Sequence, residues 1–292
     1  MSKILLEIHI VTGIMGSLRL QEYGVAIFEV IKTKSALKKT IKKNLILVNG
    51  TIATTATLLK NQDKIELFSV SEKTTQKIVD LKLEVVFEDD FLAIINKPPG
   101  ILVSGNKFKT IDNALVQNLL PSNQLDATRP RPVHRLDYPT TGLLLIGKTV
   151  TSIIALNRMF EEKEISKTYY AITIRKMNPS GTIVNPIDSK EASTYYELES
   201  SVNSQRFESL NLVKLYPRTG RKHQLRIHAA SLGNPILGDP VYGIENLILK
   251  GKGLFLHAHS LEFIHPFTKR KLFITKECPN KFQNIFPNDS CF

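Results

Sequence analysis

The order of helical and extended patterns along the chain limits its fold most strongly. Beyond Leu81, apolar runs typical of strands follow one another with only scattered helical segments between them. A doubly wound parallel sheet needs regular alternation of strands and helices, because each crossover between parallel strands requires a long connection. We therefore expect an α+β fold with a mixed or antiparallel sheet.

Individual strands and helices can be placed within this part of the chain. Residues 83–100 contain two apolar runs around an acidic turn and end on Pro-Pro-Gly, which predicts two strands. Residues 143–149 and 168–174 predict two more strands, whereas residues 151–162 have the apolar spacing of a helix.

Length and charge indicate two folded units and an anionic partner. The chain has 292 residues and a formal net charge of +12, and lysines and arginines near phosphates release condensed counterions. The two cysteines, Cys278 and Cys291, lack CxxC spacing, which argues against a disulfide framework or a zinc site. We find neither a secretory signal pattern nor an apolar run long enough to span a bilayer. We expect a cytoplasmic monomer that does not associate with membranes.

A basic helix is expected near the N-terminus. Leu37, Ile41 and Leu45 recur every four residues, and Asn49-Gly50 downstream suits a tight hairpin turn. Beside the apolar positions runs a stripe made of Lys34, Lys38, Lys39, Lys42 and Lys43. An ordinary solvated helix face would show the same stripe.

The N-terminal segment also resembles a known RNA-binding module. Residues 35–68, together with Arg19, Leu20 and Tyr23, are similar to the alpha-L module of a small-subunit ribosomal protein. The resemblance implies a small α/β RNA-binding module over residues 1–70 whose lysine stripe docks RNA. The polar segment 71–82 would then be a linker, and a second domain would span residues 83–292.

The segment Arg131–Thr149, RPVHRLDYPTTGLLLIGKT, is the most informative single run. It sets charged residues and turn formers directly before an apolar strand. Arg135 and Asp137 are therefore expected on a loop at the end of a sheet, where a rigid scaffold can present them. The bland alternative is a surface ion pair of little energetic value.

Two further segments combine strand patterns with reactive side chains. Tyr169 and Tyr170 begin a strand, so their rings point to opposite faces and at most one lines a given cleft; packing is the usual fate of such tyrosines. Leu225 and Ile227 alternate with polar residues, which predicts a half-buried strand. The face between them carries Gln224, Arg226 and His228.

Several motifs in one order resemble the RluA-type pseudouridine synthases. They are VVFEDDFLAIINKPPGILV, HRLDYPTTG, KTYYA, TGRKHQLRIHAASLG, GDPVYG and FLHAHSLEFIHP, within residues 83–275. The resemblance implies an RNA substrate and a catalytic domain built on a mixed, largely antiparallel sheet with a central cleft. It makes Asp137 the catalytic aspartate, Tyr169 the aromatic residue against the target base, and Arg226 the salt-bridge partner of Asp137. Arg135 would occupy the space vacated by the flipped nucleotide. The remaining implied substrate contacts are His134, Thr141, Arg221, His223, Gln224 and Leu225.

This sequence departs from the family pattern at three places. Thr141 stands where the family usually has serine, and Lys163 where arginine is common. The segment 181–194 is shorter than usual, so the RNA target of better-known members transfers less readily to this chain.

The implied reaction suits these residue types. Uridine becomes pseudouridine when its carbon–nitrogen glycosidic bond breaks and a carbon–carbon bond forms to the same sugar, so no atom is gained or lost. We therefore expect no cofactor and no metal. The carboxylate of Asp137 can act as nucleophile or as base, and the sequence leaves both routes open.

Other readings remain at this point. A noncatalytic RNA-binding or ribosome-assembly protein would also have a basic N-terminal module. His257, His259 and His265 suggest a metal site but lack a spaced carboxylate or cysteine, and a glycoside hydrolase would need a second carboxylate beside Asp137. Within the pseudouridine synthase reading, large-subunit ribosomal RNA is the expected target and transfer RNA the alternative.

Overall fold

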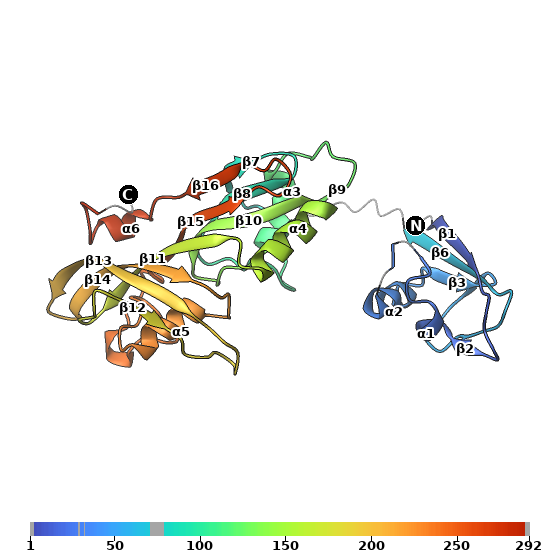
Figure 1. Ribbon diagram of the computed structural model, residues 1–292, viewed down its shortest axis with the longest axis horizontal. Coiled ribbons are helices and arrows are strands. Elements are labelled where there is room, and N and C mark those ends of the chain that lie inside the picture. The colour runs from blue at the N-terminus through green and yellow to red at the C-terminus, as the bar shows by residue number, and fades with distance from the viewer. Residues whose placement is uncertain (1–2, 29, 32, 71–78, 290–292) are drawn as a thin grey trace. The chain divides into compact units, whose positions relative to one another are not determined.

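The chain forms two compact units, residues 1–77 and 78–292, in the computed structural model (Figure 1). The structure describes residues 3–28, 30–31, 33–70 and 79–289. Most of the predicted linker therefore lies outside the described residues. The last part of it packs on the second unit: Val79 is buried there, and Gln117 and Asn118 donate side-chain hydrogen bonds to the carbonyls of Val79 and Leu81. The second unit thus begins before the boundary expected at residue 83.

The first unit is a small antiparallel sheet covered by short helices. Its main sheet has the strand order β1-β6-β3-β4, and β2 pairs with β5. The elements are β1 Lys3–Ile10, β2 Leu18–Arg19, α1 Leu20–Tyr23, α2 Lys34–Lys42, β3 Ile46–Val48, β4 Thr51–Ile52, β5 Leu58–Leu59 and β6 Lys64–Val70.

The amphipathic helix expected from the lysine stripe is α2. The Thr33 hydroxyl caps its first turn by accepting a hydrogen bond from the Ala36 amide. Leu37 and Ile41 are buried in the core of this unit, and all five lysines of the stripe are exposed. Asn49 and Gly50, both with positive φ, form the predicted turn between β3 and β4.

The second unit is built on one long mixed sheet. The strand order is β12-β13-β14-β11-β15-β10-β8-β7, with β16 beside β15 and β9 beside β10. Every strand pairing in this sheet is antiparallel except that of β10 with β15, which confirms the expected largely antiparallel sheet. Its strands are β7 Glu84–Glu88, β8 Leu92–Lys97, β9 Ala127–Pro132, β10 Thr141–Thr149, β11 Ser166–Ile174, β12 Ser180–Ile183, β13 Thr194–Ser204, β14 Glu208–Pro217, β15 Leu256–Ile264 and β16 Lys271–Thr275.

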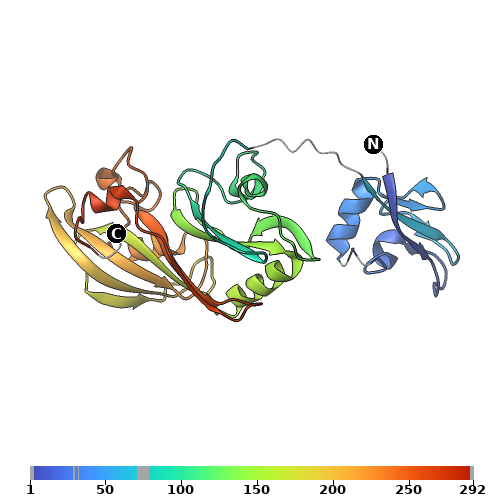
Figure 2. The same cartoon turned by 90° about the horizontal axis from the view of Figure 1, so that it is seen from above.

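Helices cover the two halves of this sheet. Helices α3 (Ile111–Asn118) and α4 (Val150–Glu161) lie beside the β7–β10 half, and α5 (Gln224–Ser231) lies beside the β11–β14 half (Figure 1). A 3₁₀ turn at Glu245–Leu247 and α6 (Asn280–Gln283) follow. Figure 2 shows the red strands β15 and β16 running between the two halves. No described helix is long and apolar enough to cross a membrane.

The strand predicted around Leu225 is wrong, because residues 224–231 form helix α5. The alternation of apolar and polar residues suggested a strand with one polar face that was either solvated or directed into a cleft. Instead Gln224, Arg226 and His228 are all buried, since hydrogen-bonding partners on distant elements satisfy them. A polar side chain satisfied in this way looks like a surface position in the sequence.

Candidate active site

A cleft of about 1320 Å³ lies where the motif segments meet in the second unit. It is larger than the roughly 300–1,000 Å³ typical of small-molecule pockets. Its cationic lining residues are Arg135, Lys163, Lys167, Arg218, Arg221, Lys222 and Arg226, and its acidic ones are Asp137, Glu161 and Glu262. The excess of positive charge suits a polyanionic ligand.

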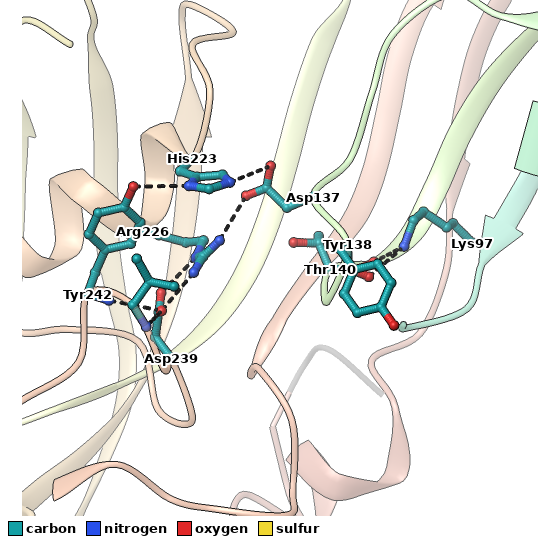
Figure 3. Close-up of polar contacts among 9 residues, drawn as sticks. Lys97, Asp137, Tyr138, Thr140, His223, Arg226, Asp239 and Tyr242 are labelled. Carbon is teal, nitrogen blue, oxygen red and sulfur yellow. Dashed lines mark hydrogen bonds and ion pairs between the residues drawn. The ribbon is translucent and has the colours of Figure 1, made fainter. Parts of the chain in front are cut away.

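A buried lysine forms hydrogen bonds with the loop that carries Asp137. Lys97, at the end of β8, donates hydrogen bonds from Nζ to the carbonyl oxygens of Pro98, Tyr138 and Thr140 at 2.9, 3.2 and 2.8 Å (Figure 3). Burial lowers the pKa of Lys97 to about 8, against an opposing effect of the Asp137 charge. Lys97 thus joins the end of β8 to both sides of the Asp137 loop.

The loop runs into β10 through a glycine that no other residue can replace without rearrangement. Gly142 has a φ of +109°, and a Cβ atom there would lie 2.2 Å from the carbonyl oxygen of Ala258 on β15. This close approach occurs where β10 pairs in parallel with β15. It sets the end of the Asp137 loop against the centre of the sheet.

The two carboxylate oxygens of Asp137 face different partners on the segment before and within α5. Oδ2 lies 3.6 Å from Nη1 of Arg226, and Oδ1 lies 3.9 Å from Nε2 of His223 (Figure 3). Burial lowers the pKa of His223, although the charge of Asp137 opposes this effect. The expected contact between Arg226 and Asp137 is therefore present, but at a separation longer than a hydrogen bond.

The strongest partner of Arg226 is Asp239, which was not among the expected site residues. Arg226 donates from Nε and Nη2 to the two oxygens of Asp239 at 2.7 and 2.8 Å, a bidentate pair. Burial opposes the charge on Arg226, yet the hydrogen bonds with Asp239 outweigh it and raise the pKa of Arg226. Burial likewise acts to raise the pKa of Asp239, but Arg226 brings it below its ordinary value.

Tyr169 and Tyr170 separate as the strand pattern predicted. Tyr169 lines the cleft, whereas Tyr170 packs edge-on against His259 with ring centroids 5.0 Å apart. Burial, and then the charge of Asp137, raise the pKa of Tyr169. Its hydroxyl therefore stays protonated near neutral pH, and its ring offers the cleft an uncharged face.

His134, Arg135 and Thr141 occupy three different environments. Arg135 is exposed at the cleft, whereas Nε2 of His134 accepts a hydrogen bond from the Leu145 amide. Burial lowers the pKa of His134 to about 3. Thr141 is buried and its hydroxyl lies 2.8 Å from Nδ1 of His257. It is the one expected substrate contact that does not line the cleft.

The residues expected around α5 reach the cleft in different ways. Arg221 is exposed and donates from Nε to the carbonyl of Glu191, and Leu225 lines the wall. Gln224 accepts hydrogen bonds from the Thr219 hydroxyl and the Arg221 amide, so it closes the turn before α5. Gln224 therefore both lines the cleft and stabilises the turn before α5.

Sequence reasoning assigned no role to Lys97, Asp239 or Tyr242, although each lies in a quoted motif. NKPPG contains the lysine, and GDPVYG contains the other two. The site residues that they contact, Tyr138, Arg226 and His223, lie 13 or more positions away, on elements whose packing the sequence does not reveal. For Lys97 and Asp239, the sequence signal that could have indicated a role was a charged residue beside Gly or Pro within a motif.

The three histidines considered for a metal site form hydrogen bonds within the protein. His257 contacts Thr141 and the Lys276 carbonyl, His259 contacts the same carbonyl, and His265 lies 2.9 Å from Asp89. Among the described residues, no group of three or more His, Cys, Asp or Glu side chains is arranged to hold a metal ion.

Comparison with known proteins identifies the class of protein. The family described as RNA pseudouridylate synthase matches residues 91–231, which include Asp137, Tyr169 and Arg226. The ribosomal large subunit pseudouridine synthase C of Rickettsia conorii is 33% identical over 276 residues, covering 84% of this chain and 88% of that protein. The chain belongs to the RNA pseudouridylate synthase family and is an enzyme of the RluA type. The noncatalytic alternative is thereby set aside.

Other relatives and solved structures agree with this assignment. The ribosomal large subunit pseudouridine synthase D of Buchnera aphidicola subsp. Schizaphis graminum is 32% identical and covers 87% of this chain and 88% of that protein. The structure of human RNA pseudouridylate synthase domain containing 4 is 26% identical, with a TM-score of 0.54 over 68% of this chain and 90% of that one. Human RNA pseudouridylate synthase domain containing 1, at 22% identity and a TM-score of 0.57 over 72% and 87%, shares the fold.

Proposed function

We propose that this enzyme converts uridine to pseudouridine in large-subunit ribosomal RNA, with Asp137 as the catalytic carboxylate. The observation that carries the proposal is the position of Asp137 in a basic cleft, beside Tyr169 and facing Arg226 and His223. The names of the Rickettsia and Buchnera relatives support ribosomal RNA as the target. Transfer RNA is the alternative substrate that the test must include.

The reaction requires an ionised carboxylate near the sugar. The bond from C1′ of the ribose to N1 of uracil breaks, and a bond from C1′ to C5 forms. The hydrogen on C5 must leave as a proton, and N1 must gain one. Asp137 can attack C1′ or remove the 2′ proton of the ribose, and in either route His223 and Arg226 face its two oxygens.

The target uridine must leave its stack before it can reach Asp137. Extrusion of a nucleotide costs a few kcal/mol and is offset when an aromatic or apolar surface receives the base. The ring of Tyr169, whose hydroxyl stays protonated, provides such a surface. The exposed side chain of Arg135 can fill the space that the nucleotide leaves. His134, Arg221, His223, Gln224 and Leu225 complete the surroundings of the substrate.

The first unit acts in this proposal as an RNA-docking module. Its five exposed lysines on or directly after α2 would contact phosphates, which adds affinity with little sequence preference. We further propose that the enzyme works in the cytoplasm as a monomer and uses no cofactor or metal ion.

The proposal is tested by mapping pseudouridines in total RNA from cells that lack this gene. Each strain would be complemented with the wild-type enzyme or with Asp137→Asn. We expect one or more pseudouridines of large-subunit ribosomal RNA to disappear and to return with the wild type alone. Loss confined to transfer RNA would refute the target, and restoration by Asp137→Asn would refute the catalytic assignment.

A further inference from the structure

We propose that the turn Asp239–Tyr242 is the positioning element of this active site. Asp239 orients the guanidinium of Arg226, and Tyr242 orients the imidazole of His223. Each oxygen of Asp137 therefore faces a side chain that a second residue holds in place. Neither Asp239 nor Tyr242 lines the cleft. The inference rests on the proposed role of Asp137.

The guanidinium of Arg226 is divided between two carboxylates. A guanidinium is a planar fork, and Asp239 holds Nε and Nη2 in bidentate geometry. That engagement leaves Nη1 directed at Oδ2 of Asp137 (Figure 3). The plane in which Arg226 can donate to Asp137 is therefore set by Asp239.

The positive charge of Arg226 is compensated mainly by Asp239. The side chain of Asp239 is fully buried and that of Arg226 is 4% exposed, so the two charges compensate each other in a medium of low polarity. Arg226 consequently faces Asp137 as a cation shared with Asp239, with Nη1 3.6 Å from Oδ2. Its effect on Asp137 depends on direction, and direction depends on Asp239.

The imidazole of His223 is held in a parallel way. Its Nδ1 lies 3.0 Å from the Tyr242 hydroxyl, while its Nε2 faces Oδ1 of Asp137. A carboxylate can only accept, so the useful tautomer has the proton on Nε2. A Tyr242 hydroxyl that donates to Nδ1 selects that tautomer, as a partner on one ring nitrogen sets the role of the other.

Backbone geometry shows that the chain maintains this arrangement against local preference. His223 has a φ of 55°, in the left-handed region, although it is not a glycine. Strain of this kind persists where surrounding contacts enforce it. Here the contact that holds the side chain is Tyr242, and Gln224 next to it is fixed by Thr219 and Ser193.

The turn itself is built around Asp239. Oδ1 of Asp239 accepts hydrogen bonds from the amides of Val241 and Tyr242 at 2.9 and 3.1 Å. Gly238 before it has a φ of +77°, and a Cβ atom there would lie 2.1 Å from the Gly253 carbonyl oxygen. The ring of Tyr242 also lies 5.0 Å from Cζ of Arg226. One turn therefore contacts both groups that face Asp137.

The test compares Asp239→Asn and Tyr242→Phe with the wild type. Turnover is measured as tritium release from a transcript of large-subunit ribosomal RNA labelled at C5 of uridine, because that position loses its hydrogen. We expect kcat to fall about tenfold or more in each variant, as small misplacements at a reacting centre do. KM should stay within about threefold, since neither side chain lines the RNA cleft.

A double-mutant cycle separates positioning from a general structural effect. If Tyr242 acts through His223, Tyr242→Phe should lower kcat in the wild type and leave it unchanged in a His223→Ala background. An equal fall in both backgrounds would overturn the role of Tyr242. Retention of kcat within about twofold by folded Asp239→Asn would overturn the role of Asp239. If Asp239→Asn does not fold, the Tyr242 cycle alone decides, and an equal fall there overturns the proposal.

Asp89→Asn is the matched control. Asp89 also caps a turn, accepting from the amides of Phe91 and Leu92, and pairs with a buried cation-forming side chain, His265, away from the cleft. It should lose thermal stability and keep kcat. Asp137→Asn is assayed alongside: activity in that variant would reject the proposed function, whereas inactive Asp137→Asn with active Tyr242→Phe and Asp239→Asn would reject this inference alone.

Discussion

At the scale of single residues, the charge of Asp137 is the feature on which we propose that turnover depends. Its amide analogue keeps the shape of the side chain and the space around Arg226 and His223, but it can neither attack C1′ nor accept a proton from the ribose. Phosphate contacts made by many lysines and arginines dominate RNA affinity. Chemistry and binding should therefore respond differently to this substitution.

We expect purified Asp137→Asn to show no measurable turnover while its RNA affinity stays within about threefold of the wild type. Turnover is followed by tritium release, and binding by filter retention of the same transcript. Glu277→Gln, an exposed carboxylate outside the cleft, is the control and should behave as the wild type. Weakened binding in proportion to lost activity would contradict the separation.

At the scale of elements, the Asp137 loop is held by the end of β8. Lys97 supplies the only side-chain ammonium among the described residues that bonds the carbonyls of both Tyr138 and Thr140. Lys97→Met keeps the volume but removes the ammonium from both carbonyls. The Tyr138 carbonyl still accepts from the Gly100 amide, whereas the loss of the buried contact with the Thr140 carbonyl costs about 1–3 kcal/mol if that group is left unsatisfied. The loop is then free to shift against β10.

We predict that Lys97→Met lowers kcat by about tenfold to a hundredfold, because displacement of Asp137 by about 1 Å has effects of that size. The measurement is kcat and KM on the same transcript, with circular dichroism to confirm folding. Lys148→Met offers a comparison, because Lys148 is also buried but bonds Glu88 and the Asp89 carbonyl instead. Full activity in folded Lys97→Met would show that the loop holds its position unaided.

At the scale of the whole molecule, the docking charge and the chemistry that we propose lie in separate units. The five lysines of the stripe belong to residues 1–77, and the cleft belongs to residues 78–292. Because Val79 is buried in the second unit, a clean truncation should remove residues 1–77 and keep Val79.

We expect the truncated enzyme, and the full chain with all five lysines replaced by glutamine, to bind RNA more weakly and with less salt sensitivity. For every phosphate that the protein no longer neutralises, the logarithmic salt dependence of binding should flatten by about 0.7–0.9. Affinities are measured across a salt series, and kcat at saturating RNA should persist. An unchanged salt slope in both proteins would mean that the lysine stripe is an ordinary solvated helix face that does not contact RNA.

Stability in acid also belongs to this scale. Burial holds the pKa of His134 at about 3 and that of His257 at about 4, well below the ordinary value of 6.5. Between pH 6.5 and 4 the unfolded chain therefore binds more protons than the folded one. The free energy of unfolding must then rise with pH through this window and fall on acidification.

Each of these histidines should remove about 2 kcal/mol of stability between pH 7 and pH 5. Denaturant unfolding can be followed by tyrosine fluorescence, since seven of the eight tyrosines lie in the second unit. His257→Asn should lose less stability on acidification than the wild type does. Equal losses in both proteins would mean that His257 is not held neutral in the folded state.

Local patterns in the sequence were enough to determine most elements, the family and the chemical class. Periodicity placed α2, α4 and the strands around Asp137, because apolar spacing is dictated by which face of an element is buried. Motifs in one order identified the RluA type, and of the catalytic and substrate-binding residues that they implied, all but Thr141 line the cleft. Both kinds of signal are local, so they survive without knowledge of the fold.

Tertiary structure alone decided where the buried polar side chains find their partners. α5 looked like a strand because Leu225 and Ile227 alternate with the polar residues Gln224, Arg226 and His228, whereas distant groups satisfy those polar side chains inside the protein. The pairing of Arg226 with Asp239 in preference to Asp137, and the Lys97 contacts below the loop, have the same origin. A buried polar group is stable only with its partner in place, and which partner that is depends on packing between elements far apart in the chain.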